Sequence, residues 1–390
     1  MKTTNPHNAH TEAAERQKNE EHPLIVAAHA VNRFFFEPSD PTTLGLMRIF
    51  AGILMLYVQL VYCIGLTDYL GPYAWISNDV AKYMRTDNAI RGPASGWQDA
   101  IWESDGEWIK GQPAMWSIYY HVEDPKWVWV IHLSIMLAML LFTLGLWTRV
   151  TSVLTWTGSL MYLHRVMQPG MLFGMDTMTN IGLFYLMFAP CGAALSLDRW
   201  LQVRRERRRL GAKYVPQPPE PRVSATFATR LLQMNFCLIY FAAGTSKLLG
   251  TSWWNGTAPS GFLLNYSFAP FDVYYYVVFL NWLVKHRWMW ELFCTIGVVG
   301  TLFLELGLPF LIWNRHTRWF MLCGSVVFHT MIALLMGLVT FSLMMLVLVL
   351  AFVPPEAVRQ TLLEYGQSLR QLWLRWTSGE AKPQMAALSR

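Results

Sequence analysis

Apolar stretches about as long as a bilayer is thick recur between residues 43 and 353, and they limit the fold more than any other feature of the chain. A helix needs about 20 predominantly apolar residues to cross the hydrocarbon core of a membrane. Hydrophobic residues make up 54% of the chain and charged residues 14%, whereas soluble domains carry about 25% charged residues. The short alternating strands of a membrane β-barrel do not occur in the pattern. The sequence therefore predicts an all-α fold, a polytopic bundle of transmembrane helices.

The apolar pattern divides the chain into three parts: a polar, partly disordered N-terminus (1–42), a transmembrane domain (43–355) and an amphipathic tail (356–390). Short helices lying on the membrane surface are expected in the aromatic loops 68–126 and 250–287. The predicted spans are 43–66, 127–146, 150–163, 178–195, 231–248, 289–313, 319–338 and 341–353.

Loop charge predicts the orientation of these eight spans. The loop 196–230 carries nine Lys or Arg against three acidic residues, and a short basic loop follows at 315–318. The loop 68–126 holds nine acidic and five basic residues. Basic loops stay on the cytoplasmic side of a membrane, so both termini are expected to be cytoplasmic. The net charge of +6 does not indicate a nucleic-acid partner, because the basic residues lie in loops between spans.

The stretch 235–256 carries a lysine near the end of the fifth span. Tyr240, Gly244 and Lys247 are spaced i, i+4, i+7, so they share one face of a helix. Gly244 is small enough for another helix to approach closely. An ionisable residue inside a span is a candidate for function, because burial favours the neutral amine, which can act as a base. A lysine at the end of a span can equally be an anchor that reaches the headgroups, so both interpretations stay open.

Two further charges lie inside predicted spans: Arg48 in the first and Glu305 in the sixth. An unpaired charge in hydrocarbon is costly. Glu305 is therefore expected to face the bundle and to bond to Arg48, a backbone group or a polar neighbour. Both are interpreted as structural charges, and they would serve as coupling residues if the chain were a transporter.

Polar residues also flank a helix-breaking stretch between the third and fourth spans. His164, Arg165 and Asp176 lie there, and irregular backbone at this depth is tolerated where it lines a cavity; an ordinary turn at the membrane edge is the alternative. In the predicted topology these residues share the outer face with Lys247, and His329 of the seventh span is within reach. The sequence therefore predicts that all five residues converge, with Arg165 contacting the substrate.

Aromatic residues complete the predicted pocket. Tyr240, Trp253 and Trp254 are expected to line it, which suits a lipid-soluble acidic substrate such as a hydroquinone. The alternative is a belt of aromatics at the membrane interface. P-loop, dinucleotide-binding and HExxH motifs are absent. The five cysteines show no CxxC or CxxH spacing, so no metal site is predicted.

The stretch YFAAGTSKL, which begins at Tyr240 and is followed by Trp253 and Gly256, resembles the lysine-bearing motif of the vitamin K-dependent γ-carboxylase family. The later stretch Phe328-His329-Thr-Met resembles a Phe-His-x-Met segment of the same family. The resemblance covers residues 43–355. Three further groups resemble the bacterial relatives known as HTTM membrane proteins: Arg48, His164-Arg165 with Gly174-Met-Asp176, and Ser196-Leu-Asp198.

The resemblance implies an integral membrane enzyme in which Lys247 is the base that deprotonates reduced vitamin K or a related quinone. It implies His329 and either His164 or Asp176 as further catalytic residues. A bacterial inner membrane, contact with membrane lipids and a peptide or protein glutamate substrate are also expected from it. Animal members carry a large luminal domain after the membrane region, where this chain has residues 354–390. The alternative function is a non-catalytic protein on the same scaffold that binds lipid or quinone or acts in peptide export or immunity. Oligomeric state is not predicted.

Overall fold

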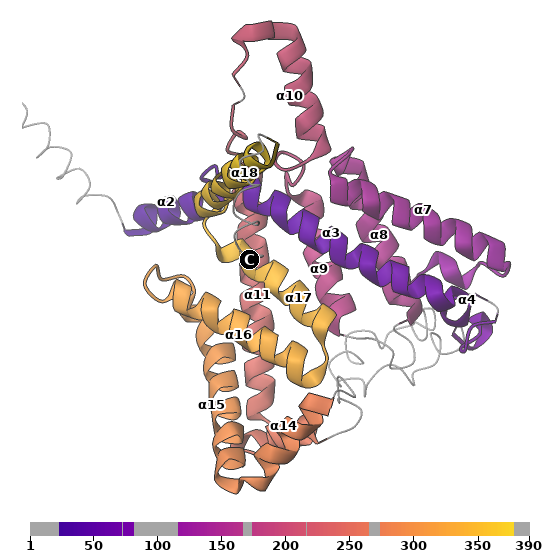
Figure 1. Cartoon of the computed structure of the whole chain (residues 1–390), viewed down its shortest axis with the longest axis vertical. Coiled ribbons are helices and arrows are strands. Elements are labelled where there is room, and N and C mark those ends of the chain that lie inside the picture. The colour runs from indigo at the N-terminus through magenta and orange to yellow at the C-terminus, as the bar shows by residue number, and fades with distance from the viewer. Residues whose placement is uncertain are drawn as a thin grey trace, which may run out of the picture.

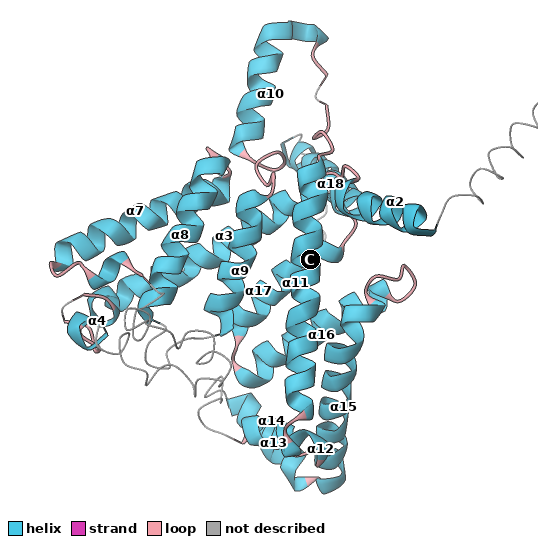
Figure 2. Cartoon of the chain, turned by 180° about the vertical axis from the view of Figure 1, so that it is seen from behind, coloured by secondary structure: helices cyan, strands magenta, loops and turns pink. Residues whose placement is uncertain are grey.

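The computed structural model describes residues 23–71, 73–81, 116–166, 174–215, 217–264 and 274–377. These residues form α-helices joined by turns and short 3-10 helices, and none of them belongs to a strand (Figure 2). Extended backbone pairs in one isolated antiparallel bridge, between Ser39 and Arg222. The predicted all-α fold is thus confirmed for the described part. Most of the loop 68–126, the predicted disordered stretch 1–21 and part of the 164–176 turn lie outside the described residues.

Each predicted span overlaps a helix. These helices are α3 (Thr42–Tyr62), α7 (Pro125–Leu144), α8 (Thr148–Val166), α9 (Gly174–Phe188), α11 (Val223–Leu248), α15 (Arg287–Leu311), α16 (Arg318–Met336) and α17 (Val339–Val349). The other elements are α2 (Pro23–Phe36), η1 (Cys63–Gly65), α4 (Leu66–Tyr69), η3 (Ile118–Tyr120), α10 (Leu197–Leu210), η4 (Gly211–Lys213), α12 (Thr251–Trp254), α13 (Ala258–Leu263), α14 (Tyr274–Lys285), η6 (Leu350–Phe352) and α18 (Pro355–Thr377). The predicted polar N-terminus, 1–42, thus contains a helix, α2.

Four helices in the described part are long and apolar enough to cross a membrane: Thr42–Tyr69, Pro125–Leu144, Arg287–Leu311 and Arg318–Met336. A fifth is added if α17 with η6 and α18, which meet at a bend of 109°, count as one span. Helices α9 and α17 are short, with 15 and 11 residues. The 26 residues of α11 extend about 39 Å, which exceeds the thickness of the hydrocarbon core. The chain is therefore a multi-pass helical membrane protein.

Helix α11 lies in the middle of the molecule (Figure 1). It packs against α15 where Gly244 faces that helix. A Cβ atom added to Gly244 would lie 2.8 Å from Leu306 Cδ2 and 3.2 Å from Glu305 Cβ. The expected close approach of another helix at Gly244 is thus confirmed, and α15 is that helix.

One end of the bundle gathers the starts of α3, α11 and α16 with the ends of α15 and α17. A cavity of about 200 Å³ there is lined by Asp40, Arg230, Arg318 and Pro354. Figure 1 shows α10 and α18 towards this end and α14 at the opposite one. The helices that meet in the cavity therefore alternate in direction.

Arg48 joins α3 to the turn that follows α9. Its side chain is completely buried. Nη1 donates to the Cys191 carbonyl oxygen at 2.9 Å, and Nη2 donates to the Leu195 carbonyl oxygen at 2.5 Å. Gly145 ends α7 beside it with a φ of +72°, and a Cβ there would lie 2.4 Å from Arg48 Nη1. The left-handed turn and the guanidinium both require glycine at this position.

Asp198, at the start of α10, holds the turn between α7 and α8. Its carboxylate accepts hydrogen bonds from the Thr148 backbone N–H at 2.9 Å, the Thr148 hydroxyl at 2.7 Å and the Trp147 N–H at 2.9 Å. Burial alone would raise the pKa of Asp198. The bonds from Thr148 and Trp147 and the charge of Arg48 outweigh burial and hold the pKa below the ordinary value of 3.8.

Candidate functional site

Lys247 and Glu305 form an ion pair between α11 and α15. Lys247 Nζ lies 2.8 Å from Glu305 Oε1, and the side chains are 24% and 6% exposed. The ammonium also lies 5.4 Å from the centre of the Trp253 ring. Among the described residues Glu305 Oε2 has no hydrogen-bond partner, although it is buried. The close approach of the two helices at Gly244, one turn before the lysine, brings the pair together.

A second polar pair, Tyr240 and His329, joins α11 to α16. The Tyr240 hydroxyl lies 2.7 Å from His329 Nε2 and 3.2 Å from the Ser325 hydroxyl. Ser325 and His329 are spaced i, i+4, so they share the face of α16 that meets Tyr240. Within the described part His329 Nδ1 is buried and has no partner. This nitrogen offers either an N–H or a lone pair, depending on the tautomer.

Both pairs open into one cavity of about 310 Å³, which we call the lysine cavity. Tyr240, Lys247, Glu305 and His329 supply most of its polar groups. Its remaining walls are mainly apolar, with Trp253, Phe262, Ile332, Met336, Leu338 and Phe341 among them.

A larger apolar cavity of about 680 Å³ adjoins the lysine cavity. The two share several lining residues, among them Trp253, Phe262, Phe328 and Met336. The apolar surface therefore continues from the polar groups along α15 and α16. Ligand pockets generally combine such walls with a few placed polar groups.

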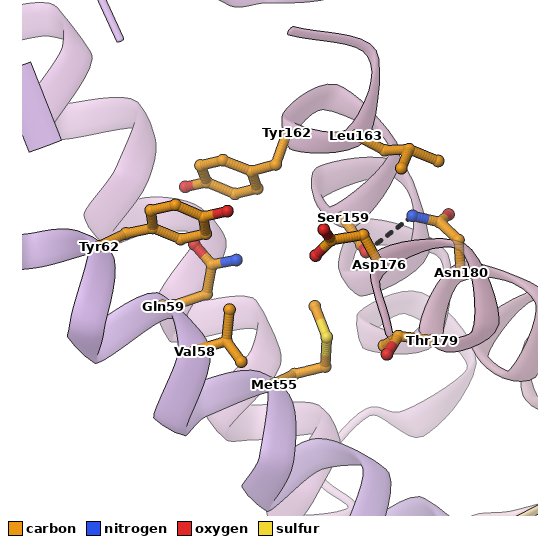
Figure 3. A pocket seen from close by; sticks show the side chains of 10 residues that line it. All are labelled: Met55, Val58, Gln59, Tyr62, Ser159, Tyr162, Leu163, Asp176, Thr179 and Asn180. Atoms are coloured by element: carbon orange, nitrogen blue, oxygen red, sulfur yellow. Dashed lines mark hydrogen bonds between the residues drawn. The ribbon is translucent and has the colours of Figure 1, made fainter. Parts of the chain in front are cut away.

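Asp176 lies in a different place, a small polar pocket between α3, α8 and α9. Figure 3 shows its carboxylate pointing into the space between Tyr62 and Ser159. Gln59 and Asn180 line the same pocket, and Asn180 Nδ2 donates to Ser159 Oγ at 2.9 Å. The volume of about 20 Å³ is enough for one water molecule. Asp176 does not line the lysine cavity.

His164 and Arg165 are also not in the lysine cavity. His164 Nδ1 lies 2.8 Å from the Trp116 carbonyl oxygen. Arg165 Nη2 donates to the Ile76 carbonyl oxygen at 2.6 Å, and the guanidinium lies over the Tyr120 ring. Both side chains therefore connect the loop 68–126 to the end of α8. The structure differs here from the expected convergence with Lys247.

The two adjacent tryptophans also separate. Trp253 lines the lysine cavity, whereas Trp254 is 71% exposed and donates to the Leu248 carbonyl oxygen at 2.6 Å. Consecutive residues of a helix point about 100° apart, so only one of the pair can face the cavity. Sequence reasoning did not select Ser325, although its i, i+4 relation to His329 was a usable signal.

No family model matches this chain, and no curated protein or solved structure matches it either. The function is therefore inferred from the residues and their geometry.

The lysine cavity can bind an amphipathic molecule and move a proton at its polar end. An amine and a carboxylate in contact share one transferable proton, so they act as a coupled acid and base. Tyr240 and His329 add a hydroxyl and an imidazole nitrogen that can hold a polar head. The apolar walls exclude water, which strengthens these polar interactions.

Proposed function

We propose that this chain is an integral membrane enzyme that uses Lys247 as a base on a reduced quinone-type lipid. The observation that carries the proposal is the lysine cavity, in which the Lys247–Glu305 pair and the Tyr240–His329 pair meet walls that are otherwise apolar. A lipid with a weakly acidic hydroxyl head and a long apolar tail would place its head at the polar pairs and its tail along the apolar walls. The resemblance to the vitamin K-dependent γ-carboxylase family favours reduced vitamin K or a related quinone.

The ion pair supports a two-step proton transfer. Lys247 passes a proton to Glu305 across the 2.8 Å contact, which leaves a neutral amine. The amine then accepts the proton of the bound hydroxyl and becomes an ammonium again, so charge is conserved across both steps. A reduced quinone supplies the acidic hydroxyl. His329 Nδ1 and the Tyr240 hydroxyl orient the polar head.

The adjoining apolar cavity gives the tail a place to lie. It follows α15 and α16 and is lined by aromatic and aliphatic side chains such as Phe293, Phe303 and Met331. By resemblance, carbon dioxide and a peptide or protein glutamate would be the further substrates. The remaining proposed partners are membrane lipids.

The proposal includes eight spans in a bacterial inner membrane, with both termini cytoplasmic and interfacial helices in the outer loops. Two observations support this topology. One end of the bundle gathers the starts of α3, α11 and α16 and the ends of α15 and α17. These helices therefore run in both directions across the bundle. The arginine-rich helix α10 lies towards that end as well (Figure 1), which agrees with the positive-inside rule. Lys247 then lies near the outer face.

A second candidate function is that of a non-catalytic lipid- or quinone-binding protein, including one that acts in peptide export or immunity. The same ion pair favours it, because Glu305 already neutralises the Lys247 charge. The cavity would then hold a lipid without reacting with it. Arg in place of Lys247 separates the two functions, since a guanidinium can pair with Glu305 but does not give up its proton.

The test measures oxidation of a reduced quinone by the purified chain in lipid nanodiscs, with dissolved oxygen as the electron acceptor and with and without labelled bicarbonate and a glutamate peptide. We expect Lys247→Arg to lose turnover while the chain still co-purifies with quinone, as identified by mass spectrometry. Lys285→Arg is the matched control, because Lys285 is an exposed lysine at the end of α14. Normal turnover by Lys247→Arg would exclude Lys247 as the base, and no turnover by the wild-type chain would leave the non-catalytic binding protein.

Topology is tested with single cysteines in a cysteine-free background. A cysteine at Asn255 should react with an impermeant reagent added outside the cell, and one at Ser224 should not; both positions are exposed. External labelling at Ser224 would place the lysine cavity on the opposite face.

A further inference from the structure

A sulfur and nitrogen cluster lies where α3 ends against α7, away from the lysine cavity. Cys63 Sγ lies 3.2 Å from His132 Nε2 and 3.8 Å from Met136 Sδ. Cys63 belongs to η1, directly after α3, whereas His132 and Met136 are spaced i, i+4 on one face of α7. A thiol, an imidazole and a thioether therefore converge from two elements that are distant in sequence.

The histidine of this cluster is held by its other ring nitrogen. His132 Nδ1 lies 2.6 Å from the Tyr162 hydroxyl, which also accepts a hydrogen bond from the Tyr119 hydroxyl at 2.8 Å. His132 and Tyr119 are fully buried. A phenol oxygen has two lone pairs, so Tyr162 can accept from both Nδ1–H and Tyr119. Metal binding requires this tautomer, in which the Nε2 lone pair lies 3.2 Å from the Cys63 sulfur. Metal-binding histidines are commonly fixed in this way.

We propose that Cys63, His132 and Met136 form a binding site for monovalent copper, Cu(I). Soft thiolate and thioether ligands select Cu(I), and imidazole is compatible with it. Zinc sites use nitrogen, thiolate and carboxylate oxygen ligands, usually four of them. A thiolate and a Cu(I) ion together carry no net charge, so the occupied site is compatible with apolar surroundings.

The two distances from Cys63 Sγ to the other ligand atoms are close to those around one small ion. First-row metals lie about 2.3 Å from sulfur and about 2.0 Å from nitrogen, the lengths found at zinc. Three such ligands around one ion are roughly 3.5–4 Å apart. The separation of 3.8 Å between Cys63 Sγ and Met136 Sδ already lies in that range. The 3.2 Å between Cys63 Sγ and His132 Nε2 must widen by a few tenths of an ångström.

The site departs from the sequence prediction of no metal, which considered only cysteine spacing. Within the described residues no three His, Cys, Asp or Glu side chains gather as metal ligands. The third residue of the cluster is a methionine, which lies far from Cys63 in the sequence. The sequence pattern therefore does not indicate the cluster. The site shares no residue with the lysine cavity and does not rest on the proposed quinone chemistry.

The test titrates the detergent-purified full chain with Cu(I) under a reductant, in competition with the colorimetric chelator bicinchoninate. We expect one tightly bound Cu(I) per chain, with X-ray absorption showing both sulfur and nitrogen neighbours. Cys63→Ser and Met136→Leu should each weaken binding by at least tenfold. Cys323→Ser is the matched control, because Cys323 is an exposed free cysteine on α16.

Tyr162→Phe tests the positioning of His132. Loss of such a supporting hydrogen bond weakens metal affinity by about 10–100-fold, whereas a merely structural tyrosine would change thermal stability and leave affinity intact. Met136→Leu preserves volume, so it decides the matter if Cys63→Ser fails to fold. Wild-type affinity in Met136→Leu, no Cu(I) binding by the wild type, or equally tight binding of Zn²⁺ would each overturn the proposal.

Discussion

The Lys247 ammonium and the Glu305 carboxylate lie 2.8 Å apart, although 58 residues separate them in the sequence. The pair lies beside Gly244, where α11 and α15 pack closely. Each charge lowers the free-energy cost of burying the other. The interaction therefore has a consequence for stability that is separate from any chemistry.

Removing one charge should destabilise the fold more than removing both. Lys247→Met leaves the Glu305 carboxylate buried without its cation, at a cost of about 2 kcal/mol, less than for a fully buried pair because the lysine is partly exposed. The double variant Lys247→Met with Glu305→Gln should recover most of this loss. Thermal unfolding in detergent measures Lys247→Met, Glu305→Gln and the double variant. A double variant as unstable as the sum of the singles would show that the pair is not coupled.

The Tyr240 hydroxyl should contribute to stability through His329 and Ser325. Tyr240→Phe removes a buried group that bonds at 2.7 Å and 3.2 Å, and we expect a loss of about 1–2 kcal/mol. Tyr57→Phe, at an exposed tyrosine of α3, should leave the unfolding temperature unchanged. Equal effects of the two substitutions would contradict the assigned role. If the proposed chemistry holds, Tyr240→Phe should also lower quinol turnover.

Substitution of glycine by alanine should change the stability of the fold in opposite directions at Gly244 and Gly300. Gly244→Ala forces Leu306 and Glu305 away and should cost about 1–2 kcal/mol. Gly300→Ala places its methyl group in open space on α15. It should be neutral or stabilise by up to about 1 kcal/mol, because alanine favours the helix. Comparing the two unfolding temperatures checks this difference; a stabilised Gly244→Ala would mean that the helices do not meet there.

Asp198 should make stability depend on pH in the acid range. Its pKa in the folded chain lies below 3.8, so its stabilisation is complete above that value and is lost as pH falls through the folded pKa. The difference in unfolding temperature between wild type and Asp198→Asn should therefore shrink below about pH 4. Glu220→Gln, at an exposed position, is the control and should show no such change. A difference that stays constant down to pH 2 would exclude this role.

The positions of the long helices could be predicted from the sequence because burial in a membrane requires continuous apolar length. The helix that passes closest to Gly244 could not, since small residues indicate close packing without naming a partner. Glu305 illustrates the same limit. Its need for a partner followed from its charge, but Arg48, a backbone group and a polar neighbour all satisfied that need. The structure selects Lys247 and gives Arg48 the carbonyl oxygens of a turn.

For the residues of the candidate site, the sequence predicted only the end of the bundle at which each one lies. Loop charge indicates at which end of the bundle a residue lies, so His164, Asp176 and Lys247 were expected together. It carries no information on position within the membrane plane. Tyr240, Trp253 and His329 do line the cavity of Lys247, whereas Asp176 lines a pocket formed by α3, α8 and α9.

The burial of Arg48 has a consequence for the order in which the helices enter the membrane during synthesis. Its two carbonyl partners belong to residues 143 and 147 positions later in the chain. When α3 leaves the ribosome, those acceptors have not yet been made, and a lone arginine inside a bilayer costs at least about 2.5 kcal/mol. We therefore expect α3 to remain beside the insertion machinery until α9 and its following turn have been translated. Helices α3, α7, α8 and α9 would then enter the lipid as one group.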